Sequence, residues 1–306
     1  MRLFASIGII LFTSVTFIAC QNDANIPSDT ISAGKIDISV DETYQPIIEQ
    51  QLKVFDSSYP DAHITVHYKP EAQCIKDLLE NKARMVLVTR ELDSNELKYC
   101  EQNAIAPTSL ALARDAVAVI VNPSSTDTTL SIEQLKGILT GQYPKKYTVV
   151  FDNEGSSTVR FITDSVLHGQ ALGANVYAAK GNPAVVDYVA KNPNAIGLIG
   201  LSYVSDEADD TTGTFLKKIK VVAMRDPKTG EYNKPYQAYV ALRSYPLTRH
   251  LYYINRETWQ GLGSGFANFL AQERGQLIFF HSHLFPLRSN IVIRDANINT
   301  DANMNR

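Results

Sequence analysis

Short apolar runs alternate along the chain with longer segments whose apolar residues recur every three or four positions. The short runs predict strands, and the three-to-four spacing predicts helices. We expect strands at residues 35–40, 62–68, 85–89, 115–123, 147–151 and 195–203. We expect helices at residues 45–55, 75–81, 131–139, 159–167 and 183–190. Strands and helices that alternate in this way indicate an α/β fold.

The two ends of the chain depart from this pattern. Residues 1–19 carry one Arg and then an unbroken run of apolar and small residues, which predicts a secretory signal peptide. Cys20 follows at a boundary similar to a bacterial lipobox, so we expect a lipid anchor on Cys20 and a tether over residues 20–33. An uncleaved N-terminal anchor and ordinary cleavage near Ala19 stay open. In each case the folded part lies outside the cytoplasm, in the periplasm or at the cell surface. The Asn-rich residues 291–306 predict a disordered tail.

Charge and cysteine content narrow the class of protein. The formal net charge is −3, with acids and bases interspersed, which argues against a nucleic-acid partner. After Cys20 only Cys74 and Cys100 remain, so the folded part can hold at most one disulfide. We expect two unpaired thiols, with a single bridge as the alternative.

The stretch Gly155-Ser-Ser-Thr158 carries the most informative chemistry. It follows a predicted strand and opens a predicted helix, and Arg160 lies two residues further on. Three hydroxyls, free backbone N–H groups and a guanidinium at a helix N-terminus are suited to holding a tetrahedral oxyanion. An ordinary N-cap also uses Ser or Thr, so capping alone is the alternative.

The sequence gives little support for a catalytic site or a metal site. The chain has no Gly-x-Ser-x-Gly motif, and no base lies near the hydroxyls of residues 156–158 in the sequence. His63 and His67 share one face of a strand but lack an acidic or Cys partner, and His281 and His283 are no better placed. We therefore expect no catalytic residues, no cofactor and no metal site.

Several stretches together resemble one known family. They are Thr89–Leu92, Val119–Pro123, Leu130–Gly141, Gly155–Thr158, Asn194–Gly197, Tyr245–Tyr252 and Phe266–Gln276. In order and spacing they are similar to the phosphate-binding proteins of ABC importers, the PstS-like branch of type II periplasmic solute-binding proteins. The resemblance implies a two-lobed type II periplasmic-binding-protein fold with two crossover strands. Lobe 1 would comprise residues 34–114 plus 246–290, and lobe 2 residues 115–245.

The resemblance also implies which residues contact the anion. From lobe 1 these are Thr43, Tyr44 and Arg90, and from lobe 2 they are Ser156, Ser157, Thr158 and Arg160. Arg90 could instead form an ion pair with Glu91 or Asp93, and Arg160 could simply pair with a carboxylate. Asp41 and Glu42 would repel an anion, so we expect both to turn outward. Neither the orientation of Glu71 nor that of Asp152 follows from the sequence.

The function implied is capture of phosphate or a similar oxyanion by a monomeric, lipid-anchored protein that performs no covalent chemistry. Its partners would be the permease and ATPase of an ABC importer and, through the lipid, the membrane. A ligand-sensing or interaction lipoprotein of the same fold, without a transporter, is the alternative. An enzyme such as a phosphatase is less favoured because no activated nucleophile appears.

Overall fold

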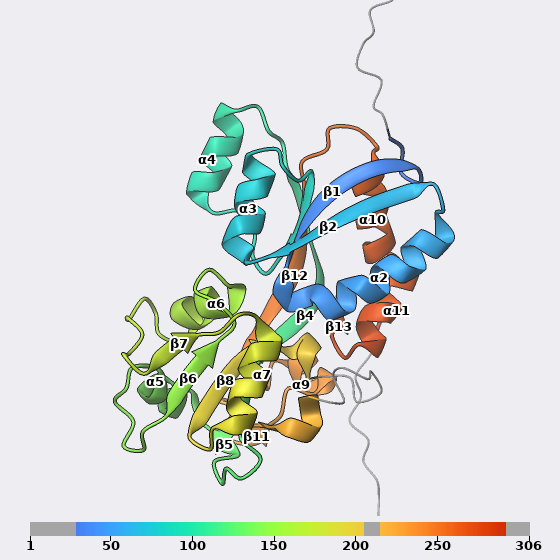
Figure 1. Cartoon of the computed structure of the whole chain (residues 1–306). Coiled ribbons are helices and arrows are strands. Elements are labelled where there is room, and N and C mark those ends of the chain that lie inside the picture. Colours follow the sequence, from blue (N-terminus) through green and yellow to red (C-terminus); the bar gives the residue numbers. More distant parts are fainter. Residues whose placement is uncertain (1–28, 205–214, 292–306) are drawn as a thin grey trace, which may run out of the picture.

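Two lobes make up the molecule, one above the other in Figure 1. The computed structural model describes residues 29–204 and 215–291. The predicted signal peptide, Cys20, most of the tether and nearly all of the predicted tail lie outside the described residues. Among the helices of the described ranges, none has the length and apolarity needed to cross a membrane.

Lobe 1 is a sheet flanked by helices (Figure 1). Its sheet runs in the order β2-β1-β3-β12-β4, with β1 parallel to β2 and β3 and with β12 at Thr248–Asn255 and β4 at Thr108–Val121. The elements in chain order are β1 (Gly34–Asp41), the short 3-10 helix η1 (Glu42–Tyr44), α2 (Gln45–Ser58), β2 (Ala62–Lys69), α3 (Glu71–Leu79), β3 (Met85–Val88), α4 (Ser94–Gln102), α10 (Leu262–Ala271), α11 (Glu273–His281) and β13 (Phe285–Pro286).

Lobe 2 repeats the layered arrangement. Its main sheet continues from β4 in the order β4-β8-β6-β7, with β6 parallel to β7 and β8. The elements are β5 (Thr129–Leu130), α5 (Ile132–Leu139), β6 (Thr148–Phe151), α6 (Ser157–Ser165), β7 (Val176–Ala178), α7 (Asn182–Lys191), β8 (Ala195–Gly200), the 3-10 helix η2 (Leu201–Tyr203), β9 (Lys220–Val221), β10 (Ala223–Arg225), β11 (Tyr232–Asn233) and α9 (Gln237–Leu242).

Two strands, β4 (Thr108–Val121) and β12 (Thr248–Asn255), connect the lobes. Residues 108–116 of β4 pair antiparallel with β12, and residues 117–121 pair antiparallel with β8. One strand therefore belongs to the sheets of both lobes. The two-lobed α/β architecture with two crossover strands is confirmed, while the residue limits of each lobe stay a prediction.

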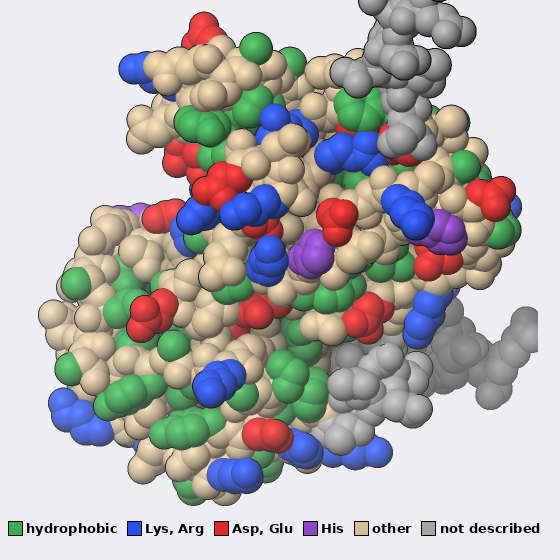
Figure 2. All heavy atoms as spheres, turned by 45° about the horizontal axis from the view of Figure 1, so that its top comes forward, with side chains coloured by type: hydrophobic (Ala, Val, Ile, Leu, Met, Phe, Trp, Pro, Cys, Tyr) green, Lys and Arg blue, Asp and Glu red, His purple; other side chains and the backbone are tan. Residues whose placement is uncertain are grey.

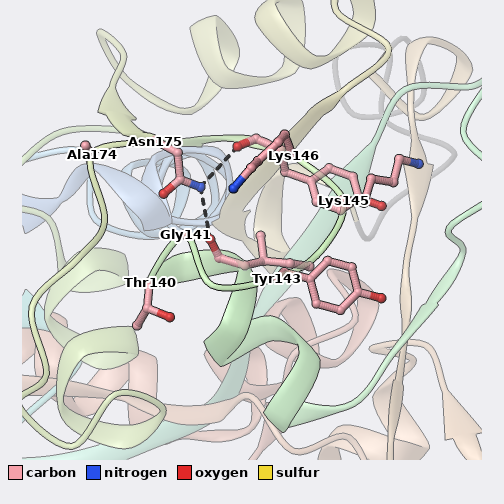
Figure 3. Close-up of a pocket in the computed structure, with 9 residues that line it drawn as sticks. Thr140, Gly141, Tyr143, Lys145, Lys146, Ala174 and Asn175 are labelled. Carbon is pink, nitrogen blue, oxygen red and sulfur yellow. Dashed lines mark hydrogen bonds between the residues drawn. The ribbon is translucent and has the colours of Figure 1, made fainter.

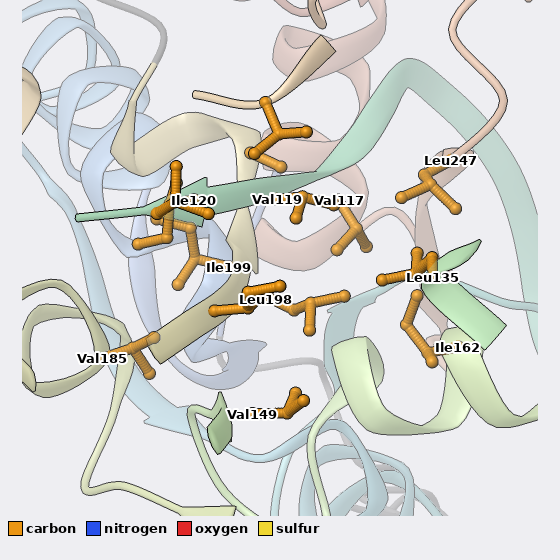
Figure 4. Packing of buried hydrophobic residues seen from close by; sticks show 14 of the residues in the cluster. Val117, Val119, Ile120, Leu135, Val149, Ile162, Val185, Leu198, Ile199 and Leu247 are labelled. Carbon is orange, nitrogen blue, oxygen red and sulfur yellow. The ribbon is translucent and has the colours of Figure 1, made fainter. Parts of the chain in front are cut away.

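Each lobe has its own buried apolar core. The core of lobe 2 joins β4, β6 and β8 to the inner faces of α5, α6 and α7, as Figure 4 shows for Val119, Val149, Ile162, Val185 and Leu198. The core of lobe 1 packs α2, α10 and α11 against β1, and a smaller cluster lies under α3 and α4. Each fully buried side chain of this kind stabilises the fold by roughly 1.5–3 kcal/mol. The two cores are separate clusters, and many of the groups between the lobes are polar.

Most predicted elements are present with shifted ends. The strand expected at residues 115–123 begins at Thr108, the helix expected at 75–81 begins at Glu71, and the helix expected at 159–167 begins at Ser157. Cys74 and Cys100 are both buried and unpaired, so the expected free thiols are confirmed and the alternative of a bridge is wrong.

Candidate functional site

Polar groups from both lobes and from a crossover strand meet between the lobes. Thr43 in η1 of lobe 1 and Ser157, the first residue of α6 in lobe 2, are both completely buried. Their hydroxyl oxygens lie 3.2 Å apart although 114 residues separate them in the chain. The Thr43 hydroxyl donates to Asp41 Oδ1 over 2.7 Å. The structure thus brings two of the predicted site residues together directly.

A glycine allows this approach of the lobes. A Cβ atom on Gly200, at the end of β8, would lie 2.0 Å from Cγ2 of Thr43. Real Cβ atoms do not come so close to another carbon, so any side chain here would push the lobes apart. Ser202 then donates a hydrogen bond to the Thr43 carbonyl, and the Tyr203 hydroxyl donates to the Glu42 carbonyl over 2.9 Å.

Arg249 on β12 is the central cation of the site, and sequence reasoning missed it. Its Nε donates to Asp115 Oδ2 on β4, and its Nη1 donates to the Ser157 hydroxyl, both over 2.9 Å. The guanidinium also lies over the ring of Tyr44, 5.7 Å from the centroid. Burial alone would lower the pKa of Arg249, but Tyr44, Asp115 and Asp41 raise it, so the side chain stays charged.

Five buried polar atoms of this arrangement have no hydrogen-bond partner within the described residues. They are Nη2 of Arg249, Oγ1 of Thr158, Oδ2 of Asp41, Oδ1 of Asp115 and the hydroxyl oxygen of Tyr44. Buried polar groups are nearly always satisfied in folded proteins. The first is a pure donor, the second can donate or accept, and a carboxylate oxygen accepts. The set can therefore hold an oxyanion. Asp41 Oδ2 can accept a hydrogen bond from a protonated oxygen of such an anion.

The expectation that Asp41 turns outward is wrong. The side chain is completely buried and accepts hydrogen bonds from the backbone N–H and hydroxyl of Thr43. It thereby caps η1, and it also faces the site. Burial and the nearby charge of Glu71 raise the pKa of Asp41 to about 6, although Arg249 opposes the shift. The sequence could not reveal this, because the neighbouring groups come from distant segments.

Ser156 has the capping role that the sequence left open. Its hydroxyl accepts the backbone N–H of Val159 over 3.2 Å, so Ser156 is the N-cap of α6. Ser157 and Thr158 follow within the first turn and are completely buried. The N-terminus of α6, with its partial positive charge, thus points toward the space beside Thr43.

Arg160 and Glu71 form an ion pair between the lobes. Nε of Arg160 donates to Glu71 Oε2, and its Nη2 donates to the Thr89 hydroxyl, both over 2.6 Å. The other carboxylate oxygen of Glu71 accepts from the N–H and the hydroxyl of Thr89. Burial favours the neutral form, but Arg160 and Thr89 prevail and lower the pKa of Glu71. Arg160 is therefore paired with a carboxylate, which is the alternative that the sequence left open.

Arg90 lies two residues after β3 and forms an ion pair with Glu96. Its two Nη atoms bind the two carboxylate oxygens of Glu96 over 2.6 and 2.7 Å, and Nη1 also donates to the Glu91 carbonyl. Neither the Glu91 nor the Asp93 side chain is its partner. As an anion ligand Arg90 stays a prediction, and this geometry gives it no support.

Glu42 and Asp152 face each other across the lobe boundary. Asn153 Nδ2 donates to Glu42 Oε1, while its backbone N–H donates to Asp152 Oδ1 over 3.0 Å. Glu42 is partly buried and Asp152 completely so. Burial, then Asp152, then Asp41 raise the pKa of Glu42 to about 7. Burial also raises the pKa of Asp152. On the face in Figure 2, basic and acidic side chains intermingle along the line between the lobes.

A separate cavity of about 320 Å³ lies at the far side of lobe 2, between α5 and the loops before β6 and β7 (Figure 3). Asn175 closes it by donating to the carbonyls of Ile138 and Tyr147, each over 3.0 Å. Lys145 on its rim pairs with Asp127. The side-chain nitrogens of Asn175 and Lys145 are thus already bonded to protein groups, which leaves Lys146 as the other basic residue of the lining. The described residues also contain no group of three His, Cys, Asp or Glu side chains arranged to hold a metal ion.

Two known proteins are similar to this chain in sequence. The chain is 22% identical over 276 residues to the phosphate-binding protein PstS of Pseudomonas aeruginosa, which covers 82% of each chain. It is 25% identical over 249 residues to protein SphX of Synechocystis sp., covering 75% of this chain and 70% of SphX.

Solved structures give the same result at the level of the fold. An ABC-type phosphate transport receptor from Vibrio cholerae superposes with a TM-score of 0.62 at 20% identity, over 83% of this chain and 100% of that chain. A candidate phosphate ABC transporter substrate-binding protein from Clostridium perfringens, solved with bound phosphate, reaches 0.70 at 23% identity, with the same coverage. The molecule has the type II periplasmic-binding-protein fold. Since residues 26–274 match the family described as the PBP superfamily domain, the chain belongs to the PBP superfamily.

Proposed function

We propose that this protein captures phosphate or a similar small oxyanion between its lobes and delivers it to the permease and ATPase of an ABC importer. The observation that carries the proposal is the buried guanidinium of Arg249, which binds Ser157 and keeps Nη2 free, together with the free hydroxyl of the next residue, Thr158. A buried, unsatisfied donor set of this kind is costly unless a ligand satisfies it. The relatives named for phosphate binding and phosphate transport support the same ligand class.

The contact residues of the proposal differ partly from those expected. Thr158 and Arg249 supply the free donors. Ser157 is bonded to both Thr43 and Arg249 and so positions the guanidinium, against which Tyr44 packs. Asp41 supplies an acceptor that favours an oxyanion carrying a hydrogen and repels one without it. Arg160 is engaged by Glu71, and Ser156 acts by capping α6.

No covalent step is part of the proposed activity. The hydroxyls of Ser157 and Thr158 have no histidine or lysine among their hydrogen-bond partners in the described part of the chain. A lipid on Cys20 would keep the protein at the outer face of the membrane, and binding and release by lobe opening and closure would then pass the anion to the importer.

Calorimetry with inorganic phosphate, arsenate, sulfate and nitrate tests the proposal. We expect saturable binding of phosphate or another tetrahedral oxyanion. Thr158→Val removes one hydrogen bond to a buried anion, so it should weaken binding about ten- to a hundredfold. Thr163→Val makes the same chemical change later in α6 and should bind like the wild type. No binding of any tetrahedral oxyanion, or equal affinity in the Thr158→Val protein, would contradict the proposal.

A further inference from the structure

The proposed anion site is surrounded by more negative than positive groups. Four of its carboxylates, those of Asp41, Glu71, Asp115 and Asp152, are almost completely buried, and that of Glu42 is partly buried. Two guanidinium groups, those of Arg160 and Arg249, form ion pairs with members of this set. Binding an anion beside these buried carboxylates is strongly unfavourable unless one or more of the carboxylates carry a proton.

The two ion pairs account for only two of the carboxylates. Glu71 pairs with Arg160 and Asp115 with Arg249. Asp41, Glu42 and Asp152 form no ion pair among the described residues, and their hydrogen bonds come from neutral donors such as Thr43 and Asn153. The excess charge is thus concentrated where η1 of lobe 1 meets the end of β6 in lobe 2.

Glu42 is the member of this group whose surroundings depend on closure. Asn153 and Tyr203, which bind its side chain and its carbonyl, both belong to lobe 2, as does Asp152. In lobe 1 its acidic neighbour is Asp41. Strand β8 of lobe 2 packs on η1 and carries no titratable residue. Glu49 on α2 adds another negative charge near Tyr203. Every titratable neighbour of Glu42 on these elements is therefore acidic or a neutral phenol.

We propose, on the basis of the proposed function, that the lobes close on the oxyanion together with a proton that Glu42 takes up from solution. In the closed arrangement Glu42 shares buried space with Asp152 and Asp41. When the lobes separate, water returns to Glu42 and its carboxylate can ionise without repulsion. Anion capture is then favoured in mildly acidic surroundings and weakened in alkaline ones.

The direction of the pH effect follows from the pKa of Glu42. With the lobes together, burial, Asp152 and Asp41 raise that pKa to about 7, above the ordinary value of a Glu side chain. Well below the ordinary value the side chain is protonated in both states and closure carries no penalty. Between the ordinary value and about pH 7 closure binds a proton, so affinity falls with rising pH by at most about tenfold per pH unit for one proton. Above about pH 7 the penalty is complete and the profile becomes flat.

The test compares the wild type with Glu42→Gln, which is neutral at every pH. Calorimetry with inorganic phosphate between about pH 5 and pH 8, in pairs of buffers with different ionisation enthalpies, gives the affinity and the number of protons taken up. Both proteins meet the same titration of phosphate itself, so their difference isolates Glu42. Glu154→Gln, which removes an exposed carboxylate two residues after Asp152, is the matched control.

We expect Glu42→Gln to come closest to the wild type near pH 5 and to bind at least about tenfold more tightly near pH 8, with less proton uptake. Glu154→Gln should follow the wild type throughout. Parallel profiles for the wild type and Glu42→Gln would overturn the inference. Absence of phosphate binding by both proteins would overturn the choice of phosphate in the proposed function. The inference would then be judged by the ligand-free unfolding midpoints, which must favour Glu42→Gln near pH 8 and converge near pH 5.

Discussion

Arg249 is the residue on which the interior of the site depends most. Its side chain is 2% exposed and that of Asp115 is fully buried, and the pair links the two crossover strands. Breaking a buried pair by removing one partner is far more costly than replacing both, because the remaining charge is buried without compensation.

Arg249→Met should therefore destabilise the protein by about 3–5 kcal/mol, since Asp115 is left unpaired. The double variant Arg249→Met with Asp115→Leu should recover most of this loss. Urea unfolding of the two variants and the wild type measures both effects. A single variant within about 1 kcal/mol of the wild type would mean that water or another group already compensates Asp115.

At the scale of elements, the N-terminus of α6 separates two roles that look alike in the sequence. Ser156 accepts the N–H of Val159 as a cap, whereas the Ser157 hydroxyl contacts Thr43 and Arg249. Ser156→Ala should lower the free energy of unfolding by about 1 kcal/mol, the usual value of an N-cap hydrogen bond. Thermal or urea unfolding measures it, and Ser165→Ala at the other end of α6 is the control. An unchanged stability would argue that the hydroxyl does not cap the helix.

Local patterns predicted most of the strands and helices up to residue 203, but not α4 and not the elements that follow. α5 begins after Ser131, as its sequence indicates, and Ser131 and Gln134 form a complete capping box. The sequence predicted the start of α3 at residue 75, whereas the helix begins at Glu71. Pro70 and Glu71 do not contribute to an apolar periodicity, although Pro is common at helix N-termini.

The orientation of the site's charges was beyond the reach of local patterns. Glu71 is fixed by Arg160, 89 residues away, and Arg249 by Asp115, 134 residues away. Such pairs depend on how the lobes meet, which neither periodicity nor motif spacing encodes. The resemblance to a family pointed to Thr43 and residues 157–158, which the structure brings together, and to Arg90 and Arg160, but it did not point to Arg249.

At the scale of the whole molecule, two separate cores and a polar boundary favour movement of the lobes as units. Bonds across that boundary include hydrogen bonds, such as those between Thr43 and Ser157 and between Glu42 and Asn153, and the ion pair of Glu71 with Arg160. Polar contacts can be exchanged with water at modest net cost, so opening is feasible without unfolding either core.

A crystal structure of the protein grown with phosphate tests the central claim most directly. The account predicts tetrahedral density between the lobes, within about 3 Å of Arg249 Nη2 and the Thr158 hydroxyl, with Asp41 Oδ2 accepting from the anion. Crystals of the Thr158→Val protein should show weaker occupancy at the same place. Density for the anion only on the surface, with the guanidinium of Arg249 still bound to protein groups alone, would contradict it.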